Sequence, residues 1–293
     1  MNIGIDLMGG DSAPELPLKM VLELQNNPTY SSHQFHCFGT QKVLEPTLNK
    51  PNLSPCNCSS DIPSDFKNPK EILSKQDSSI YQGLLALQKG EIDVFLSAGN
   101  TGAIVVAAKF LIPVSEGITR PCLAIKVPKV DGTFGLLVDV GANVDVKPEH
   151  LSQFAQLGMD FASKSLGISK PSLGLINIGS EPYKGDKLRQ IAFKNLNTQF
   201  PEFIGNIEGW EIFDKKADVM VCDGFTGNVV LKLSEGFAQI LLKQDKKHPF
   251  LNQFRMENHG GSFLLGYRKP IIIGHGSSNQ STLENMLKLA IQF

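Results

Sequence analysis

The sequence lacks an apolar run of the roughly 20 residues that a membrane-spanning helix needs. It also lacks an excess of charge of either sign, with 28 Lys and Arg residues against 29 Asp and Glu residues. A general nucleic-acid binder would be basic, so we expect no nucleic-acid partner. The first residues carry no charged segment followed by a signal core. With 293 residues, 41% of them hydrophobic, the chain has the composition of a globular protein. Because the sequence shows no export signal, we expect the protein in the cytoplasm.

Paired cysteines and the common nucleotide and protease motifs are also missing. The five cysteines are an odd number without an export signal, so we expect reduced thiols. Cys56 and Cys58 form the only close pair and have no histidine at metal spacing. The motifs G-x-x-x-x-G-K-[ST], G-x-S-x-G and H-E-x-x-H are absent, and no clean G-x-G-x-x-G follows the first strand. We therefore expect no cofactor and no metal.

Apolar strands alternate with helical patterns along the chain. Residues 94–97 read as a buried strand, 99–102 as a tight turn and 103–111 as a helix. This alternation predicts an α/β fold with a mainly parallel sheet, and a hairpin turn at 130–133 makes the sheet mixed. We expect one domain over residues 1–293, with a small helical protrusion around 240–262. Further strands are expected at 3–8, 34–38, 122–127, 135–140, 173–178, 203–207, 219–222 and 271–273, and helices from 14, 43–48, 78–89, 150–166, 187–200, 229–243 and 282–291.

Six loops that follow predicted strands combine small residues with Asn, Asp, Glu or His. Carboxyl ends of parallel strands share one edge of a sheet, so we expect the loops to line a crevice that binds an anion. Asn100, Asn143 and Asn228 can donate side-chain N–H groups to an oxyanion there, or can simply cap their turns. The residues expected to bind phosphate and substrate are Gly9, Gly10, Asp11, Gly99, Thr101, Gly141, Gly224, Thr226, Gly227 and Ser277.

Two further side chains in these loops have a functional and a structural interpretation. Lys184, beside Gly185, either attracts phosphate and stabilises an oxyanion or is a solvated loop lysine. His275 is either a base or anion donor, or an imidazole bonded to backbone. The aspartates that flank the loops can hold lysines or a metal, but their spacing singles out no metal site. They are Asp6, Asp11, Asp139, Asp145 and Asp223.

Five motifs in this order resemble the PlsX family of bacterial phosphate acyltransferases, and the match runs from Met1 to beyond Ser278. The motifs are DLMGGD at 6–11, SAGNTGA at 97–103, DVGANVD at 139–145, DGFTGNVVLK at 223–232 and HGSS at 275–278. The resemblance implies transfer of an acyl group from acyl carrier protein to inorganic phosphate, in phospholipid synthesis. It also implies a homodimer with a three-layer α/β/α fold similar to isocitrate and isopropylmalate dehydrogenases. A membrane glycerol-3-phosphate acyltransferase would use the acyl phosphate.

The resemblance suits the residues in the loops. Phosphate is largely dianionic near neutral pH and attacks a thioester without a protein nucleophile. The enzyme must hold the anion beside the thioester and stabilise the tetrahedral oxyanion. Lys184 matches a Lys-Gly loop of the family, so we assign it phosphate binding and oxyanion stabilisation. We expect Asn100, Asn143 and Asn228 to orient the groups, with His275 as a further candidate.

The sequence departs from the family in places and leaves rival functions open. Ser12 stands where many relatives carry histidine, and the segment 68–79 is less basic than usual. The basic and aromatic segment 243–255 is shorter than the helical extension that the resemblance links to carrier-protein and peripheral membrane contact. The rivals are a phosphotransacetylase that uses acyl-CoA, a nicotinamide-dependent dehydrogenase, and a non-catalytic scaffold for lipid synthesis.

Overall fold

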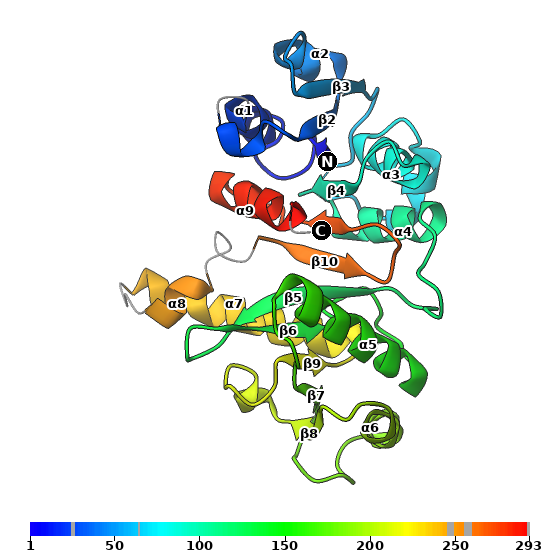
Figure 1. The fold of residues 1–293 in the computed structure, drawn as a ribbon, viewed down its shortest axis with the longest axis vertical. Helices are drawn as coiled ribbons and strands as arrows, with labels where there is room; N and C mark the ends of the chain where they lie inside the picture. Colours follow the sequence, from blue (N-terminus) through cyan, green and yellow to red (C-terminus); the bar gives the residue numbers. More distant parts are fainter. Residues whose placement is uncertain (25–26, 64, 245–248, 255–259, 292–293) are drawn as a thin grey trace. The chain divides into compact units, whose positions relative to one another are not determined.

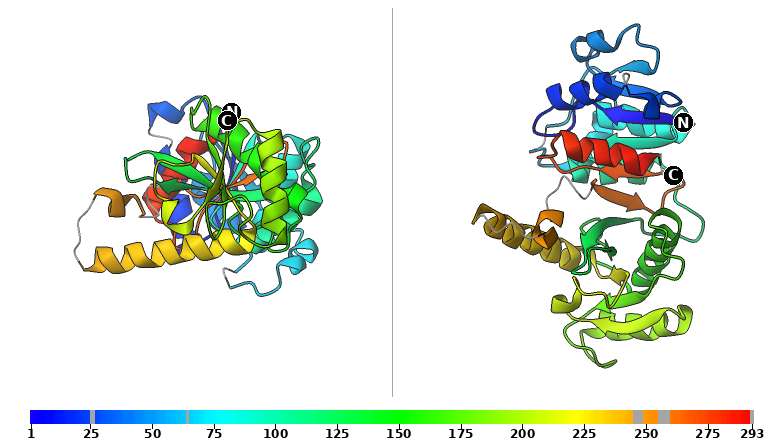
Figure 2. Two further views of the ribbon diagram at one scale, coloured as in Figure 1. Left: turned by 90° about the horizontal axis from the view of Figure 1, so that it is seen from below. Right: turned by 60° about the vertical axis from the view of Figure 1, so that its left-hand side comes forward.

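The computed structural model describes residues 1–24, 27–63, 65–244, 249–254 and 260–291. The chain divides into two compact units, one of residues 1–115 and 256–293 and the other of residues 116–255. Figures 1 and 2 trace the alternating strands and helices of both, which confirms the predicted mixed α/β fold. The single domain with a protrusion around 240–262 stays a prediction, because residues 245–248 and 255–259 lie outside the described part.

The first unit is built on a twisted sheet with the order β3-β2-β1-β4-β11-β10. All neighbouring pairs are parallel except β10 and β11, which are antiparallel. Strand β4 is buried along its whole length, as expected for a parallel strand covered on both faces. The strands are β1 (Asn2–Asp6), β2 (Gln34–Gly39), β3 (Leu53–Asn57), β4 (Val94–Ser97), β10 (Ser262–Leu265) and β11 (Ile271–Ile273).

Helices cover both faces of this sheet. Helices α3 (Ser79–Lys89) and α4 (Thr101–Leu111) pack together on one face, while α1 (Glu15–Leu24) and α9 (Gln280–Ala290) pack together on the other (Figure 1). Ser78 caps the start of α3 and Gly90 ends it in a left-handed conformation. Short helical segments complete the unit: η1 (Pro28–Tyr30), α2 (Gln41–Leu44), η2 (Glu45–Thr47) and η3 (Pro69–Ser74).

The second unit repeats the layered plan around strands in the order β5-β6-β9-β7-β8. Strands β5 and β6 form the predicted hairpin, and the remaining pairs are parallel. Helix α5 (Pro148–Ser165) packs on β6 and β9 and against α6 (Lys187–Gln199), whereas α7 (Gly224–Lys243) contacts β6 from the opposite face (Figure 1). The other elements are β5 (Cys122–Pro128), β6 (Phe134–Val138), β7 (Leu173–Ile176), β8 (Phe203–Ile207), η4 (Gly209–Glu211), β9 (Val219–Val221) and α8 (Pro249–Gln253).

Three sequence predictions of elements were wrong. Helix α7 begins at Gly224 and not at Val229, because Asp223 caps it and accepts a hydrogen bond from the Thr226 amide. Strand β10, which begins at the end of the polar segment 244–262, was not predicted from the sequence. The single helix expected at 43–48 is the short helix α2 followed by the 3-10 turn η2.

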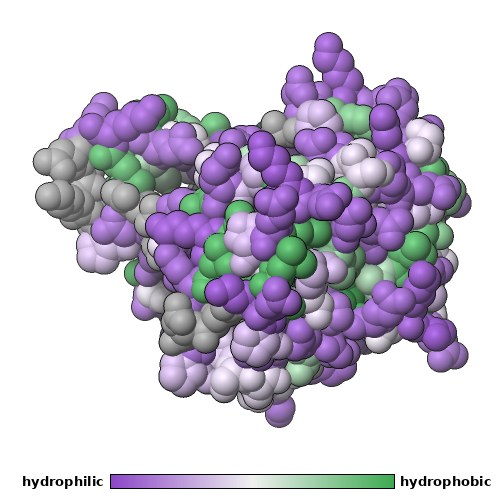
Figure 3. Space-filling view, turned by 90° about the horizontal axis from the view of Figure 1, so that it is seen from above, coloured by the Kyte–Doolittle hydropathy of each residue, from purple (hydrophilic) through white to green (hydrophobic). Residues whose placement is uncertain are grey.

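The surface in Figure 3 is largely hydrophilic, with hydrophobic side chains gathered in small groups between charged and polar ones. Among the described residues, no helix combines the length and the apolar character needed to cross a bilayer.

Candidate functional site

In the first unit, Asp6 holds the loops that follow β1 and β4. These strands and β11 are parallel, so their carboxyl ends share one edge of the sheet. The Asp6 carboxylate accepts hydrogen bonds from the Met8 amide at 2.9 Å and from the Ser97 hydroxyl at 2.6 Å. The Ser97 hydroxyl in turn accepts from the Gly99 amide at 3.0 Å. Burial raises the pKa of the Asp6 carboxyl, and the hydrogen bonds oppose that shift.

The loops that follow β1, β4 and β11 lie against one another. A Cβ atom on Gly9 would stand 2.6 Å from the Gly99 nitrogen, so only glycine lets these two loops touch. The Asp11 amide donates to the Gly276 carbonyl at 2.7 Å, which joins the loop after β1 to the loop after β11. The expectation that these loops meet at one edge is therefore met within the unit.

Two other predicted side chains of the first unit, those of Asn100 and His275, make hydrogen bonds within their own loops, and the Asn100 side-chain nitrogen also donates to the Phe66 carbonyl at 3.4 Å. Asn100 caps α4, with its side-chain oxygen accepting from the Ala103 amide at 2.9 Å, and Thr101 is the first residue of that helix. His275 is exposed; its Nδ1 lies 3.0 Å from the Ser277 hydroxyl and accepts from the Ser277 amide at 3.3 Å. The Asn100 oxygen therefore caps its turn, and one His275 nitrogen is bonded to the backbone, as the structural interpretations of these residues stated.

In the second unit, Asp139 plays the part that Asp6 plays in the first. One carboxylate oxygen accepts from the amides of residues 123, 141 and 142 at 3.0–3.1 Å. The other accepts from the Asn143 amide at 2.7 Å and from its side-chain nitrogen at 2.9 Å. Burial raises the pKa of Asp139 against these hydrogen bonds. Asn143 also donates to the Pro121 carbonyl at 2.8 Å, so both of its side-chain protons stabilise the loop around Gly141.

The start of α7 packs directly on this loop. The Gly224 amide donates to the Asn143 carbonyl at 2.7 Å, and a Cβ atom on Gly227 would lie 1.9 Å from the Asp139 carbonyl oxygen. Asn228 donates one side-chain proton to the Val140 carbonyl at 3.2 Å and is exposed to solvent. Gly224 and Gly227 therefore serve close helix–loop packing, while Asn228 keeps a second amide proton for a ligand.

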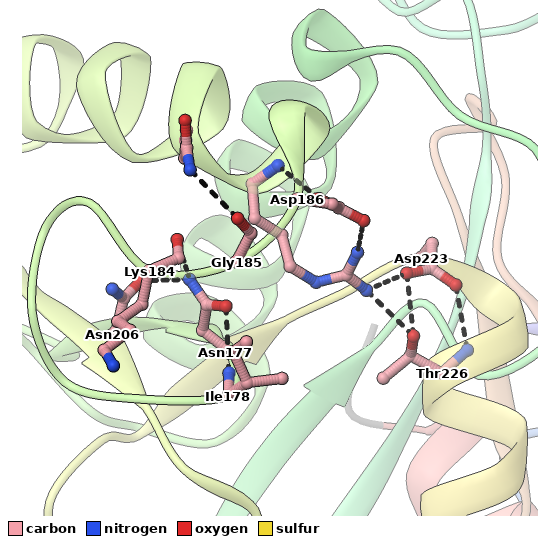
Figure 4. A network of polar contacts seen from close by, with 10 residues as sticks. Asn177, Ile178, Lys184, Gly185, Asp186, Asn206, Asp223 and Thr226 are labelled. Carbon is pink, nitrogen blue, oxygen red and sulfur yellow. Dashed lines mark hydrogen bonds and ion pairs between the residues drawn. The ribbon is translucent and has the colours of Figure 1, made fainter.

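Lys184 lies in the loop between β7 and α6, and its main chain is anchored (Figure 4). Its carbonyl accepts from Asn177 at 3.1 Å, and its amide donates to the Glu181 carbonyl at 3.0 Å. Asn177 also donates to Asn206 at 3.1 Å. Within the described residues the Lys184 ammonium has no carboxylate or carbonyl partner; it lies 5.7 Å from the centre of the Tyr183 ring. A rigid main chain thus carries a cation that is free to bind an anion.

An arginine that the sequence did not single out connects the Lys184 loop to α7. Arg189 donates to Asp186 at 2.7 Å, to Thr226 at 2.9 Å and to Asp223. Figure 4 labels these three acceptors. Burial disfavours ionisation of Asp223, but its hydrogen bonds from Thr226 and the Arg189 charge outweigh burial and lower its pKa. The sequence signal was slight: Asp186 and Arg189 have the spacing of a cap and a first-turn residue, but the Asp223 contact depends on tertiary structure.

The cysteines do not provide a nucleophile. All five are free thiols. Burial raises the pKa of Cys37 and Cys58 to about 12 and that of Cys56 to about 11, and it raises the pKa values of Cys122 and Cys222 well above the usual value of a thiol. At neutral pH these thiols stay protonated. In the part of the chain that the structure describes, no group of three or more His, Cys, Asp or Glu side chains is placed to hold a metal ion.

Comparisons with known proteins give a consistent result. The sequence model of a family described as "Fatty acid synthesis protein" matches residues 1–248. A phosphate acyltransferase of Pseudothermotoga lettingae is 38% identical, with 99% of this chain and 92% of that protein covered. A phosphate acyltransferase of Staphylococcus aureus strain JH9 is 36% identical, with 99% and 93% covered. In fold, the chain is similar to a phosphotransacetylase from Streptococcus pyogenes, with a TM-score of 0.69 at 16% identity over 100% of this chain and 92% of that one.

Proposed function

Because this chain belongs to the fatty acid synthesis protein family and is an acyltransferase, we propose that it transfers the acyl group of acyl-[acyl carrier protein] to inorganic phosphate in phospholipid synthesis. The observation that carries the proposal is the Lys184 ammonium, which has no ion-pair partner among the described residues. Lys184 lies on an anchored loop, and Arg189 connects the helix that follows this loop to the start of α7. A cation in that setting suits a phosphate or a developing oxyanion.

The reaction needs little more than placement and charge. A phosphate oxygen attacks the thioester carbonyl carbon, and the carbonyl oxygen becomes an oxyanion. The tetrahedral intermediate then collapses as the carbon–sulfur bond breaks, which releases the carrier thiolate and acyl phosphate. Lys184 binds phosphate and stabilises the oxyanion, and the remaining side-chain proton of Asn228 orients one of the reacting groups.

The roles of the other predicted residues follow from their contacts. Asn143 shapes the loop that supports α7 instead of donating to the substrate, because its side-chain protons are already used. In the first unit, the loops that Asp6 organises present Gly99 and Asn100, and the loop after β11 presents Ser277; we keep these three as phosphate- or substrate-binding candidates. His275 keeps Nε2 for a ligand, since its recorded bonds use Nδ1.

The implied partners remain proposals of the same kind. Exposed apolar side chains recur at helical spacing along α7 and give a second copy of the chain a surface to bury, which supports the homodimer. They are Phe225, Val229, Leu233, Phe237 and Ile240, each 50–63% exposed. The cytoplasmic location is the expectation drawn from the sequence, whereas peripheral membrane contact and delivery of acyl phosphate to a membrane glycerol-3-phosphate acyltransferase rest on the resemblance alone.

A trapping assay tests the activity. Purified protein is mixed with phosphate and either acyl-[acyl carrier protein] or acyl-CoA, and acyl phosphate is trapped with hydroxylamine as the hydroxamate. We expect phosphate-dependent hydroxamate from the carrier-protein substrate. Product from acyl-CoA alone would make the protein a phosphotransacetylase. No product from either thioester would favour a non-catalytic scaffold.

A further inference from the structure

One guanidinium joins the starts of two helices in the second unit. Asp186 caps α6 and Asp223 caps α7, and both carboxylates accept hydrogen bonds from Arg189. The Thr226 hydroxyl in the first turn of α7 accepts a third, at 2.9 Å. The Arg189 side chain is only 15% exposed, so these bonds are held away from most of the solvent.

The two helix starts carry the residues that the proposed reaction uses. Lys184 precedes the Asp186 cap by two residues, and Asn228 lies one turn after the Asp223 cap. In addition, Gln190 donates to the carbonyls of Tyr183 and Gly185 at 2.9 and 3.0 Å, so the first turn of α6 is tied to the loop that bears Lys184. A shift of either helix start would therefore change the distance between Lys184 and α7.

The contact requires arginine chemistry. A planar guanidinium presents several N–H donors in a fixed fork and can pair with two carboxylates and a hydroxyl at once. The ammonium of lysine is a single point charge and cannot reproduce that geometry. Without a cation between them, Asp186 and Asp223 would present two negative charges to the same region, beside the place where phosphate is expected to bind.

We propose that Arg189 is a positioning residue, which fixes Lys184 relative to the first turn of α7 and does not itself contact substrate. The inference rests on the proposed function, because it assigns Arg189 an effect through Lys184. Its three recorded acceptors use both terminal nitrogens, and Asp223 and Thr226 share one of them.

A double-mutant cycle tests the coupling. Because small misplacement of a catalytic group is costly, Arg189→Met should lower kcat and raise the KM for phosphate, with at least a tenfold loss in kcat/KM. Arg189→Lys should retain part of that activity. If Arg189 acts through Lys184, adding Arg189→Met to Lys184→Ala should cost less than a further twofold. Lys187→Met is the matched control, since Lys187 is an exposed cation in the same turn of α6, and it should behave as wild type.

The outcomes separate the inference from the proposed function. Equal losses from Arg189→Met in the wild-type and Lys184→Ala backgrounds, or no loss in either, would overturn the positioning role. If Arg189→Met does not fold, Arg189→Lys is carried through the same cycle. Hydrogen exchange gives a readout without turnover: amides of 181–186 and 224–228 should exchange faster in Arg189→Met than in Lys187→Met. An inactive wild type would refute the proposed function, while unchanged exchange would refute the coupling.

Discussion

The Ser97 hydroxyl donates a 2.6 Å hydrogen bond to the buried carboxylate of Asp6 and accepts one from the Gly99 amide at 3.0 Å. One small side chain thus connects the end of β1, the end of β4 and the turn before α4. Ser97 is itself buried, so water cannot readily replace either bond.

Replacing Ser97 by alanine should therefore lower the free energy of unfolding by about 1–3 kcal/mol. The folded-state pKa of Asp6 is already raised by burial and should rise further without the hydroxyl. A raised folded pKa means that stability falls as pH increases through it, so the loss should be larger at pH 7 than at acid pH. Urea unfolding at several pH values measures this. Ser74→Ala, which removes an exposed hydroxyl bonded to the Glu71 carbonyl, is the control, and an equal loss in both variants would contradict the buried role.

Local signals in the sequence were enough to predict most of the fold. Ser78 and Gly90 bound α3 as their residue types indicate, and the apolar stretch at 94–97 correctly predicted β4. Helix α4 follows as expected but begins at Thr101, two residues before the predicted start, because Asn100 caps it. Two glycines near the start of α7 looked like a loop, because glycine is a poor helix former. There, packing on the Asp139 loop and the Asp223 cap outweigh propensity.

The site was predicted less completely than the fold. Lys184 stood out beside its glycine, but nothing local indicated that Asn177 and Asn206 would meet at the ends of β7 and β8. Arg189 and Asp223 are 34 residues apart, and their contact exists only because the starts of α6 and α7 converge. Pairings that depend on tertiary structure leave no spacing to read in a single sequence.

Lys184→Ala should abolish most of the proposed activity without unfolding the protein. The recorded hydrogen bonds of this residue are made by its main chain, so the loop should stay anchored when the side chain is shortened. Loss of one group that stabilises an oxyanion costs about 10²–10³ in kcat, and we expect a fall in that range with a raised KM for phosphate. Steady-state rates of acyl phosphate formation measure both constants. Lys187→Ala should leave them unchanged, and a fully active, folded Lys184→Ala would remove Lys184 from the mechanism.

Two glycines of α7 should respond in opposite ways to alanine. A Cβ atom at Gly227 would overlap the Asp139 carbonyl oxygen, so Gly227→Ala should displace the helix start and destabilise the protein by roughly 1–3 kcal/mol. Nothing lies within 4 Å of the corresponding atom at Gly236, and Gly236→Ala should stabilise the helix by roughly 0.5–1 kcal/mol. Thermal and urea unfolding compare the pair. A neutral Gly227→Ala would show that the close approach is not required.

The exposed apolar side chains of α7 predict the oligomeric state. Leu233→Asp and Phe237→Asp should each reduce the native mass from two chains to one, because a buried charge at an interface is costly. Both side chains are 59% exposed within the chain, so folding of the single chain should be preserved. Light scattering coupled to size exclusion gives the mass, with the exposed Gln239→Asp on the same helix as control. A wild-type mass of one chain, or a mass of two chains in both Leu233→Asp and Phe237→Asp, would contradict this interface.

Lys129 should make the free energy of unfolding rise with pH in the alkaline range. A lysine whose pKa is raised by an ion pair has the opposite effect. Its ammonium is buried, with a residue exposure of 2%, and donates to the carbonyls of Ile212 and Ala217 at 2.9 and 2.8 Å. Burial lowers the pKa of Lys129 to about 8, although Asp218, Asp214 and Asp131 oppose the shift. As the pH rises, the folded state therefore releases this proton first, because the pKa of a lysine in the unfolded state is near 10.4.

Between these two pKa values the unfolded chain binds more protons at this residue, so the contribution of Lys129 to stability rises with pH. The free energy of unfolding of the wild type relative to Lys129→Met should be flat below pH 7 and should increase by about 3 kcal/mol between pH 8 and 10.5. Taking the difference cancels the titration of the buried cysteines, which both proteins share. Urea unfolding of both proteins across pH 6–10.5 measures it, the acid half of the series being the internal control. A difference that stays constant over the whole range would show that Lys129 keeps its proton in the folded protein.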